Sequence, residues 1–157
     1  MPQQRTKVLF ICLGNACRSP MAEAIARKDA ADEIEPSSAG LAPLGFVAQM
    51  TKETLTRNGY TPDDLASKAI SAEALVAADL IINMSGRPRE HAFRFIPHRA
   101  RIEDWEIEDP YGDAEKYQST YESIRQRVHD LAARLRSEFS TRSKAQTDAS
   151  ATSQRGD

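Results

Sequence analysis

The run TKVLFI at residues 6–11 restricts the possible folds most strongly. Its last four side chains are all apolar, which is typical of a strand buried on both faces of a parallel sheet. A helical pattern begins at Pro20, a residue favoured in the first turn of a helix. On that helix Met21 would face the sheet while Glu23 faces water. The opening segment is therefore predicted to be a strand, a loop over residues 12–19 and a helix.

Strand-like and helix-like segments alternate along the rest of the chain. This alternation predicts an α/β domain of three layers, with about four parallel strands and helices on both faces of the sheet. Ligands of such sheets bind at the carboxyl ends of the strands, and Cys12 lies at one of these ends. Later strands are expected near residues 35–39, 80–84 and 101–107, and later helices near residues 47–59, after Ser71, near 87–95 and over 117–135.

The last predicted helix has the clearest periodicity in the chain. Apolar positions recur at alternating steps of four and three from Tyr117 to Leu135, so this stripe is expected to pack on the sheet. Residues 140–157 have no apolar pattern and consist largely of small and polar residues, which predicts a disordered polar tail. We therefore expect one domain over residues 1–139, followed by this tail.

Charge and composition exclude several classes of protein. With 21 basic and 23 acidic side chains the formal net charge is -2, so no nucleic-acid or membrane partner is expected. No apolar stretch approaches the roughly 18 residues that span a bilayer, and residues 1–5 do not form a signal-peptide pattern, which indicates a cytoplasmic protein.

The two cysteines are too few for a disulfide scaffold, and no histidine lies at zinc-like spacing from them. They are therefore reactive or merely buried, and no metal site is expected.

The loop from Cys12 to Ser19, with the sequence CLGNACRS, has the features of an anion site. Loop N–H groups and the start of a helix favour negative charge, and Arg18 supplies a planar fork for two phosphate oxygens. The same field favours the thiolate of Cys12, which would act as a nucleophile. Ser19 is placed to donate its hydroxyl to that sulfur. Gly14 suits the tight turn that such a loop requires.

The sequence from Val8 to Glu23, VLFICLGNACRSPMAE, closely resembles the signature loop of low-molecular-weight protein tyrosine phosphatases. Residues 38–40, 79–84 and 108–112 correspond to further segments of that family, so the resemblance covers roughly residues 7–138. It implies hydrolysis of phosphotyrosine in protein substrates through a phosphocysteine intermediate, without a metal or cofactor. A monomer is the default expectation.

The resemblance also implies an acid and a set of supporting residues. A thiolate cannot also protonate the leaving phenolate, and the aspartate of the family's Asp-Pro pair, here Asp109, is the general acid. Asn15 resembles the asparagine that braces the loop, with Ser38 as its partner. Tyr111 resembles an aromatic residue on the rim that contacts the substrate ring. The predicted phosphate- and substrate-binding residues are Leu13, Gly14, Asn15, Ala16, Cys17, Ser19 and Tyr111.

Cys17 has two interpretations. It resembles the second cysteine that traps oxidised Cys12 in a reversible disulfide, and it is equally well explained as a side chain that fills space behind the loop.

Three departures from the family pattern leave the substrate preference undetermined. Ser85 and Gly86 follow the strand at residues 80–84, where many members have an acidic residue. The segment after Gly40 is shorter and lacks the usual tryptophan, with Phe46 as a possible substitute. Gly112 occupies the place of a second tyrosine after Pro110.

Three other functions remain open. An arsenate reductase on the same scaffold usually passes oxidation to further cysteines, and none follows Cys17, although an external thiol could replace them. A protein-arginine phosphatase carries threonine at the position of Ala16, where tyrosine-type members usually have a larger aliphatic residue. A non-enzymatic phosphate-binding or redox-sensing module would not require Asp109.

Overall fold

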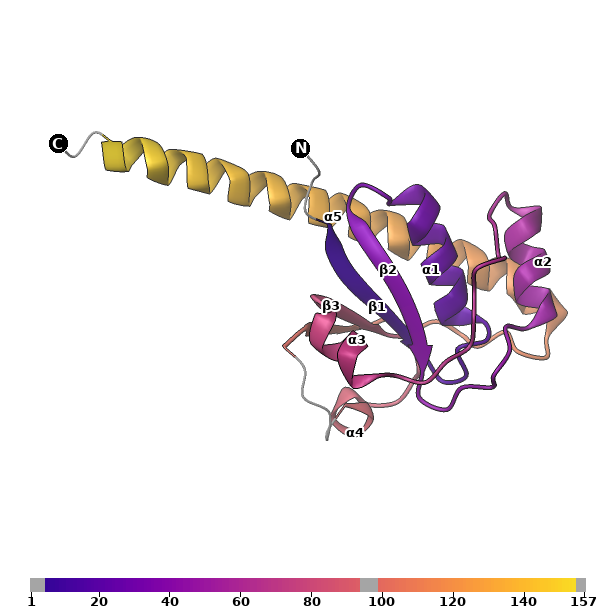
Figure 1. Cartoon of the computed structure of the whole chain (residues 1–157). Coiled ribbons are helices and arrows are strands. Elements are labelled where there is room, and N and C mark those ends of the chain that lie inside the picture. Colours follow the sequence, from indigo (N-terminus) through magenta and orange to yellow (C-terminus); the bar gives the residue numbers. More distant parts are fainter. Residues whose placement is uncertain (1–4, 94–98, 155–157) are drawn as a thin grey trace.

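Four parallel strands form the central sheet, in the order β2-β1-β3-β4 (Figure 1). The structure is a computed structural model that describes residues 5–93 and 99–154, with side chains up to residue 142. A parallel sheet of four strands with helices on both faces confirms the predicted fold class. The strands are β1 (Thr6–Cys12), β2 (Ile34–Gly40), β3 (Leu80–Asn83) and β4 (Arg101–Asp104).

The strands β1 and β3 carry apolar side chains on both faces of the sheet, and helices bury each face. Val8, Phe10 and Ile82 pack in one core with α1, α2 and α5, whereas Leu9 and Ile81 pack in a second core with α3. Burial on both faces explains the continuous apolar runs in these strands. The helices are α1 (Arg18–Asp29), α2 (Gln49–Arg57), α3 (Ala72–Ala77), α4 (Arg89–Ala92) and α5 (Ala114–Gln154).

The predicted ends of the helices are confirmed at two positions. Ser71 precedes α3, and its hydroxyl accepts a hydrogen bond from the Ala74 N–H at 3.0 Å. Gly59 follows α2 with φ +90°, the left-handed conformation that favours glycine. The predicted basic helix is short, because α4 covers only residues 89–92, and residues 94–95 lie outside the described part of the chain.

The expectation that Glu23 faces water is wrong. Residues 18–26 of α1 are all buried, and only 6% of the surface of Glu23 is exposed. This half of the helix is enclosed by β1 and β2 on one side and by α2 and α5 on the others. A single exposed stripe, on which the sequence pattern relies, is therefore absent from the start of α1.

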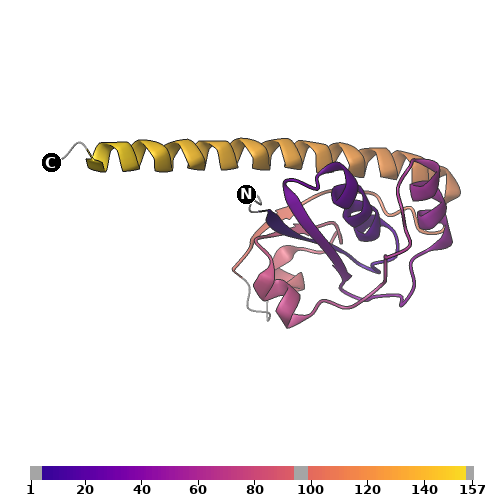
Figure 2. The same ribbon diagram turned by 45° about the horizontal axis from the view of Figure 1, so that its top comes forward.

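Helix α5 extends through Gln154 and projects past the rest of the molecule (Figure 2). Over residues 140–154 this differs from the expected disordered tail, and residues 155–157 lie outside the described part. No glycine or proline interrupts residues 114–154, so the packed first half of the helix can propagate without tertiary contacts. No helix in the described residues is both long and apolar enough to cross a membrane.

A polar cluster ties the end of α1 to α5 and to the segment after α2. The carboxylate of Asp29 accepts a hydrogen bond from the Tyr60 hydroxyl and lies 2.8 Å from Nε2 of His129. Burial opposes the charge on Asp29, but the hydrogen bonds from His129 and Tyr60 outweigh it and lower the pKa of the carboxyl. The ionised carboxylate is thus favoured in the folded protein.

We expect Asp29→Asn to lower the free energy of unfolding by about 1 kcal/mol at pH 7. A lowered pKa in the folded state stabilises the protein at pH values above the unfolded value of 3.8. That stabilisation is lost as the pH falls through the lower folded value. Urea titrations of both proteins from pH 7 down to pH 3 would measure the difference. A difference that does not shrink at low pH would contradict this role of the carboxylate.

Candidate active site

A cavity of about 280 Å³ lies at the carboxyl end of β1, on the loop that leads into α1. The cavity brings together most of the residues that the sequence predicted for the site. Asn15, Ser19 and Ser38 are buried behind this lining and support it. The cavity is lined by Cys12, Leu13, Gly14, Ala16, Cys17, Arg18, Ala42, Leu44, Asp109 and Tyr111.

The loop backbone is held by hydrogen bonds to its carbonyl groups. The carbonyls of residues 12, 13, 14 and 16 accept N–H groups of residues 41, 42, 44 and 48, and the carbonyls of Gly14 and Ala16 also accept the hydroxyls of Ser67 and Thr51. Because the C=O and the following N–H point in opposite directions in a trans peptide, the N–H groups turn away from these partners. Among the described residues, the N–H groups of residues 13–17 have no hydrogen-bond partner. They form a concave set of donors, which suits an anion.

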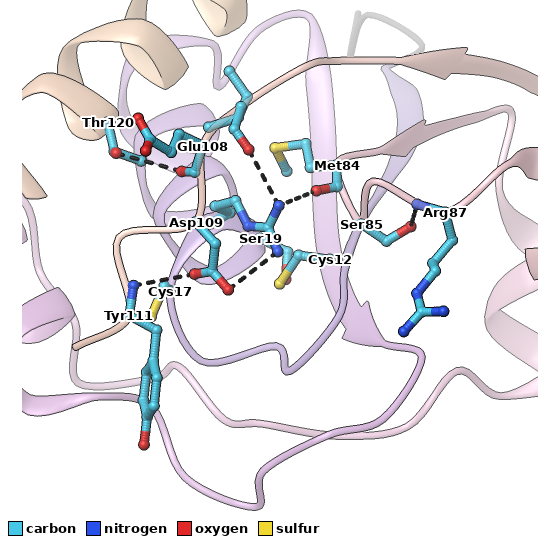
Figure 3. Close-up of polar contacts among 12 residues, drawn as sticks. Cys12, Cys17, Ser19, Met84, Ser85, Arg87, Glu108, Asp109, Tyr111 and Thr120 are labelled. Atoms are coloured by element: carbon cyan, nitrogen blue, oxygen red, sulfur yellow. Dashed lines mark hydrogen bonds and ion pairs between the residues drawn. The ribbon is translucent and has the colours of Figure 1, made fainter. Parts of the chain in front are cut away.

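Arg18 adds a fixed positive charge to these donors. Its Nη1 donates to the carbonyls of Met84 and Ile107 at 2.5 and 3.1 Å, and its Nη2 lies 3.5 Å from Asp109 (Figure 3). Within the described part of the chain, its Nε is buried and has no hydrogen-bond partner. A buried donor that lacks a partner is costly, so a bound oxyanion would satisfy it.

The absence of an acidic residue after β3 is explained by these carbonyl partners. Ser85 occupies that position. Its hydroxyl donates to Oδ1 of Asn83 at 2.6 Å, so it stabilises the segment after β3 rather than holding Arg18. Neutral carbonyls hold the guanidinium in place without neutralising it. Asp109 is the carboxylate that pairs with Arg18, at 3.5 Å, and a bound oxyanion could replace it.

A chain of hydrogen bonds directs the Ser19 hydroxyl toward Cys12. The Lys68 N–H donates to Oδ1 of Asn15 at 2.9 Å, which orients the amide so that its Nδ2 donates to Ser19 at 2.7 Å. The Ser19 Oγ lies 2.9 Å from the sulfur of Cys12. Since Ser19 accepts from Asn15, its hydroxyl proton is free to stabilise a thiolate.

Glu23 extends this network, although sequence reasoning placed it on the surface. Nδ2 of Asn15 also donates to Ser38 at 3.1 Å, and Ser38 donates to the carboxylate of Glu23 at 2.5 Å. Arg27 contacts the other oxygen of that carboxylate at 2.5 Å. The presence of Glu23 within the recognised signature segment was the signal that could have identified it.

Close packing between β2 and the loop fixes the loop conformation. Asn15 has φ +47°, a left-handed backbone conformation in which its side chain reaches these partners. A Cβ on Gly40 would lie 2.9 Å from Asn15 N and from Leu13 O, both backbone atoms. Only glycine therefore allows β2 to approach the loop this closely.

Asp109 and Tyr111 approach the cavity from the segment between β4 and α5. The Tyr111 N–H donates to Oδ1 of Asp109 at 3.2 Å, a local turn that holds the carboxylate toward Arg18. The Tyr111 ring is 54% exposed on the rim. Leu44 also lines the cavity, whereas Phe46, the expected substitute for the tryptophan, is 53% exposed and is not part of the lining.

Cys17 lies beside Cys12 in the cavity lining but has a different environment. Its sulfur is 3.2 Å from the Tyr117 hydroxyl, and both cysteines are free thiols. Burial raises the pKa of the Cys17 thiol, and the negative charge of Asp109 adds to this, although hydrogen bonds from Tyr117 and Thr51 partly oppose it. Cys17 is therefore held as a neutral thiol at pH 7. Its pairing with oxidised Cys12 stays a prediction.

Comparison with known proteins assigns the chain to a family. Residues 7–141 match the family described as low molecular weight phosphotyrosine protein phosphatase. The chain belongs to this family. A solved low molecular weight protein tyrosine phosphatase from T. tengcongensis superposes with a TM-score of 0.74 at 30% identity, covering 82% of this chain and 99% of that one.

The relatives are divided between two activities. The low molecular weight protein-tyrosine-phosphatase YfkJ of Bacillus subtilis is 33% identical, with 77% of this chain and 87% of the relative covered. The arsenate reductase of Bacillus licheniformis is also 33% identical, with 78% and 86% covered. Overall identity therefore does not distinguish the two activities.

We expect Gly40→Ala to weaken phosphate binding and to lower the free energy of unfolding by about 1–3 kcal/mol, because its Cβ would collide with backbone that cannot move freely. Phosphate inhibition constants and urea titrations would measure both effects. Gly59→Ala is the matched control, since it introduces backbone strain far from the loop. It should lower stability and leave phosphate affinity unchanged. Unchanged phosphate affinity in Gly40→Ala would contradict the packing argument.

We expect iodoacetamide at pH 7 to alkylate Cys12 before Cys17. Cys12 lies on the floor of the anion site, whereas burial keeps Cys17 protonated and poorly nucleophilic. Peptide mapping by mass spectrometry at successive times would give both rates. Added phosphate should protect Cys12. Faster alkylation of Cys17 than of Cys12 would contradict the environments assigned to the two thiols.

Proposed function

We propose that this protein is a protein tyrosine phosphatase that hydrolyses phosphotyrosine through a phosphocysteine intermediate. One observation carries the proposal: the unpartnered N–H groups of residues 13–17 and Nε of Arg18 surround the cavity that contains the sulfur of Cys12. Such donors match the equatorial oxygens of the phosphoryl group in the transition state of its transfer. The carboxylate of Asp109 lies on the same cavity, where a leaving group would need a proton.

In the first step the Cys12 thiolate attacks phosphorus and the bond to the tyrosyl oxygen breaks. The phosphoryl oxygens would replace Asp109 as the partner of Arg18. Released from that ion pair, the carboxylate of Asp109 would bind a proton brought in by the phosphate monoester and transfer it to the leaving phenolate. The phosphoryl group is then bonded to sulfur. The free tyrosine side chain departs with the proton from Asp109.

In the second step a water molecule hydrolyses the phosphocysteine. Asp109, now ionised, accepts a proton from the water as its oxygen attacks phosphorus. The bond between phosphorus and sulfur breaks, inorganic phosphate is released and the thiolate is regenerated. The hydrogen bond from Ser19 stabilises the sulfur as a leaving group.

The shape and lining of the cavity favour an aryl phosphate on a protein. Cys12 is buried at the bottom, and the walls include Leu13, Leu44 and the exposed ring of Tyr111. A tyrosyl ring would span this depth and contact apolar side chains, whereas the shorter phosphoserine would not reach the sulfur. Phosphorylated proteins are therefore the proposed substrates, and no cofactor is needed for this chemistry.

Arsenate reduction is the second candidate, because an arsenate reductase is as similar in sequence as a phosphatase. Arsenate would bind the same donors, and Cys12 could attack it. Reduction then requires a second thiol to attack the arsenylated sulfur of Cys12, and the sequence has no cysteine besides Cys12 and Cys17, whose burial raises its pKa and holds it as a neutral thiol. An external thiol would have to complete the reaction.

Ala16 bears on the choice between phosphotyrosine and phosphoarginine. It lines the cavity and is almost completely buried, so its small side chain leaves room without offering a polar contact to a guanidinium group. This supports phosphotyrosine over phosphoarginine as the substrate. Hydrolysis rates of matched phosphotyrosine and phosphoarginine peptides would test the preference directly.

The mechanism predicts different effects for two substitutions. We expect Cys12→Ser to lose all turnover yet still bind phosphate, because the donors around the cavity remain. We expect Asp109→Ala to reduce hydrolysis of phenyl phosphate by about 100-fold or more, with a much smaller loss on p-nitrophenyl phosphate, whose leaving group needs no proton. Steady-state kinetics on both esters would measure these effects.

Asp113→Ala is a matched control for Asp109→Ala, since Asp113 lies four residues further along the same segment and does not line the cavity. Its rates on both esters should equal those of the wild type. Turnover by Cys12→Ser would overturn the mechanism. Equal losses of Asp109→Ala on the two esters would remove Asp109 as the acid. Arsenate-dependent oxidation of added thiols, without ester hydrolysis, would favour the reductase.

A further inference from the structure

A second and larger cavity, of about 730 Å³, lies at the opposite end of the sheet. It is formed between the amino-terminal ends of β1, β3 and β4 and the second half of α5, which passes over the start of β1 (Figures 1 and 2). We call it the basic cleft. It is lined by Arg5, Thr6, Lys7, Asp79, Arg99, Arg101, Leu135, Glu138, Phe139 and Arg142.

Cationic residues predominate in the basic cleft although the chain as a whole is slightly acidic. Five lining residues are Lys or Arg and two are acidic, whereas the full sequence has a net charge of -2. Asp79 is partly committed to the fold, because its Oδ2 accepts the backbone N–H of Lys7 at 2.9 Å. The concentration of positive charge at this one cavity would attract an anion.

The cationic side chains of the basic cleft have no close ion-pair partners among the described residues. Among the described residues, Lys7 and Arg142 have no ion-pair partner. The other three arginines of the cleft lie beyond hydrogen-bond distance from their partners: Arg5 is 3.8 Å from Glu35, Arg99 is 3.7 Å from Asp79 and Arg101 is 3.7 Å from Glu138. Three arginines elsewhere on the surface lie closer to their carboxylates: Arg89 and Arg134 at 2.7 Å and Arg136 at 2.8 Å.

An apolar wall lies beside these charges. Phe139 on α5 is 45% exposed, and Leu135 lies one turn earlier on the same helix; both line the cleft. A ligand that combined several negative charges with a flat ring would use both parts of the cleft. The volume is within the range of sites that enclose small organic ligands.

We propose that the basic cleft binds a nucleoside polyphosphate. The phosphate chain would accept hydrogen bonds from Lys7, Arg142 and the loosely paired arginines, and the base would pack on Phe139. Since Lys7 lies at the start of β1 and Arg142 on α5, the ligand would also join α5 to the amino-terminal end of the sheet. This site is distinct from the Cys12 cavity and does not depend on the reaction proposed there.

Arg18→Ala protein provides the cleanest test, because the Cys12 cavity also attracts phosphates. Isothermal titration calorimetry with ATP, inorganic tripolyphosphate and AMP, without divalent cations, would measure binding at the basic cleft. We expect ATP and tripolyphosphate to bind, AMP to bind much more weakly, and all affinities to fall with added salt. ATP should also raise the melting temperature of the protein.

Three further variants in the Arg18→Ala background locate the site. Lys7→Ala combined with Arg142→Ala should weaken ATP binding about tenfold, since two exposed charges are removed. Arg57→Ala on α2 removes an exposed arginine far from the cleft and should change nothing. Phe139→Ala should weaken ATP and leave tripolyphosphate unchanged.

Two results would overturn the proposal. One is no binding of ATP or tripolyphosphate to Arg18→Ala protein, and the other is an affinity that the double substitution does not change. If Phe139→Ala affected neither ligand, the nucleoside part of the assignment would be wrong. In the wild-type background, the double substitution Lys7→Ala with Arg142→Ala should leave the rate of ester hydrolysis unchanged. The test of the basic cleft is thereby independent of the test of the Cys12 mechanism.

Discussion

The direction of the peptide groups between Cys12 and Arg18 is the constraint on which the rest of the site depends. Outward hydrogen bonds to the loop carbonyls turn the N–H groups toward the cavity, and the close approach of Gly40 leaves the loop little freedom to reverse. The donors are therefore preorganised before any ligand arrives, which is what makes electrostatic stabilisation effective. The proposed roles of Cys12, Arg18 and Asp109 depend on an anion bound by these N–H groups.

The same arrangement explains how a positive site can exist in a slightly acidic protein. Arg18 is held in place by carbonyl groups, and its ion pair is with the half-exposed carboxylate of Asp109, which a bound oxyanion could replace. Glu23, a buried carboxylate of the supporting network, is directed toward Ser38 and Arg27 instead. At the other end of β1, the loosely paired cations of the basic cleft form a second positive region. The strand thus separates two regions of positive charge that the net charge does not reveal.

Much of the fold and the identity of the loop could be predicted because their signals are local. Buried parallel strands are continuous apolar runs, and the segment from Cys12 to Ser19 carries its chemistry in consecutive residues. The burial of Glu23 could not be predicted from the periodicity of its helix, since it depends on α2 and α5 enclosing α1; only its place in the signature segment pointed to it. The carbonyl partners of Arg18 come from Met84, just after β3, and from Ile107, after β4. The lining of the cavity by Leu44 rather than Phe46 depends on the path of a loop. The extension of α5 follows from the absence of helix breakers, a signal that the polar composition obscured.

The central claim is that Cys12 receives the phosphoryl group from the substrate, and direct trapping of that intermediate tests it most directly. A phosphotyrosine peptide mixed with the wild-type enzyme, quenched in denaturant at neutral pH within the first turnover, would be analysed by intact mass and peptide mapping. The account predicts a mass increase of one phosphoryl group, located on Cys12. Rapid release of phosphate with no phosphorylated Cys12 at any time, or with the phosphoryl group on another residue, would contradict it.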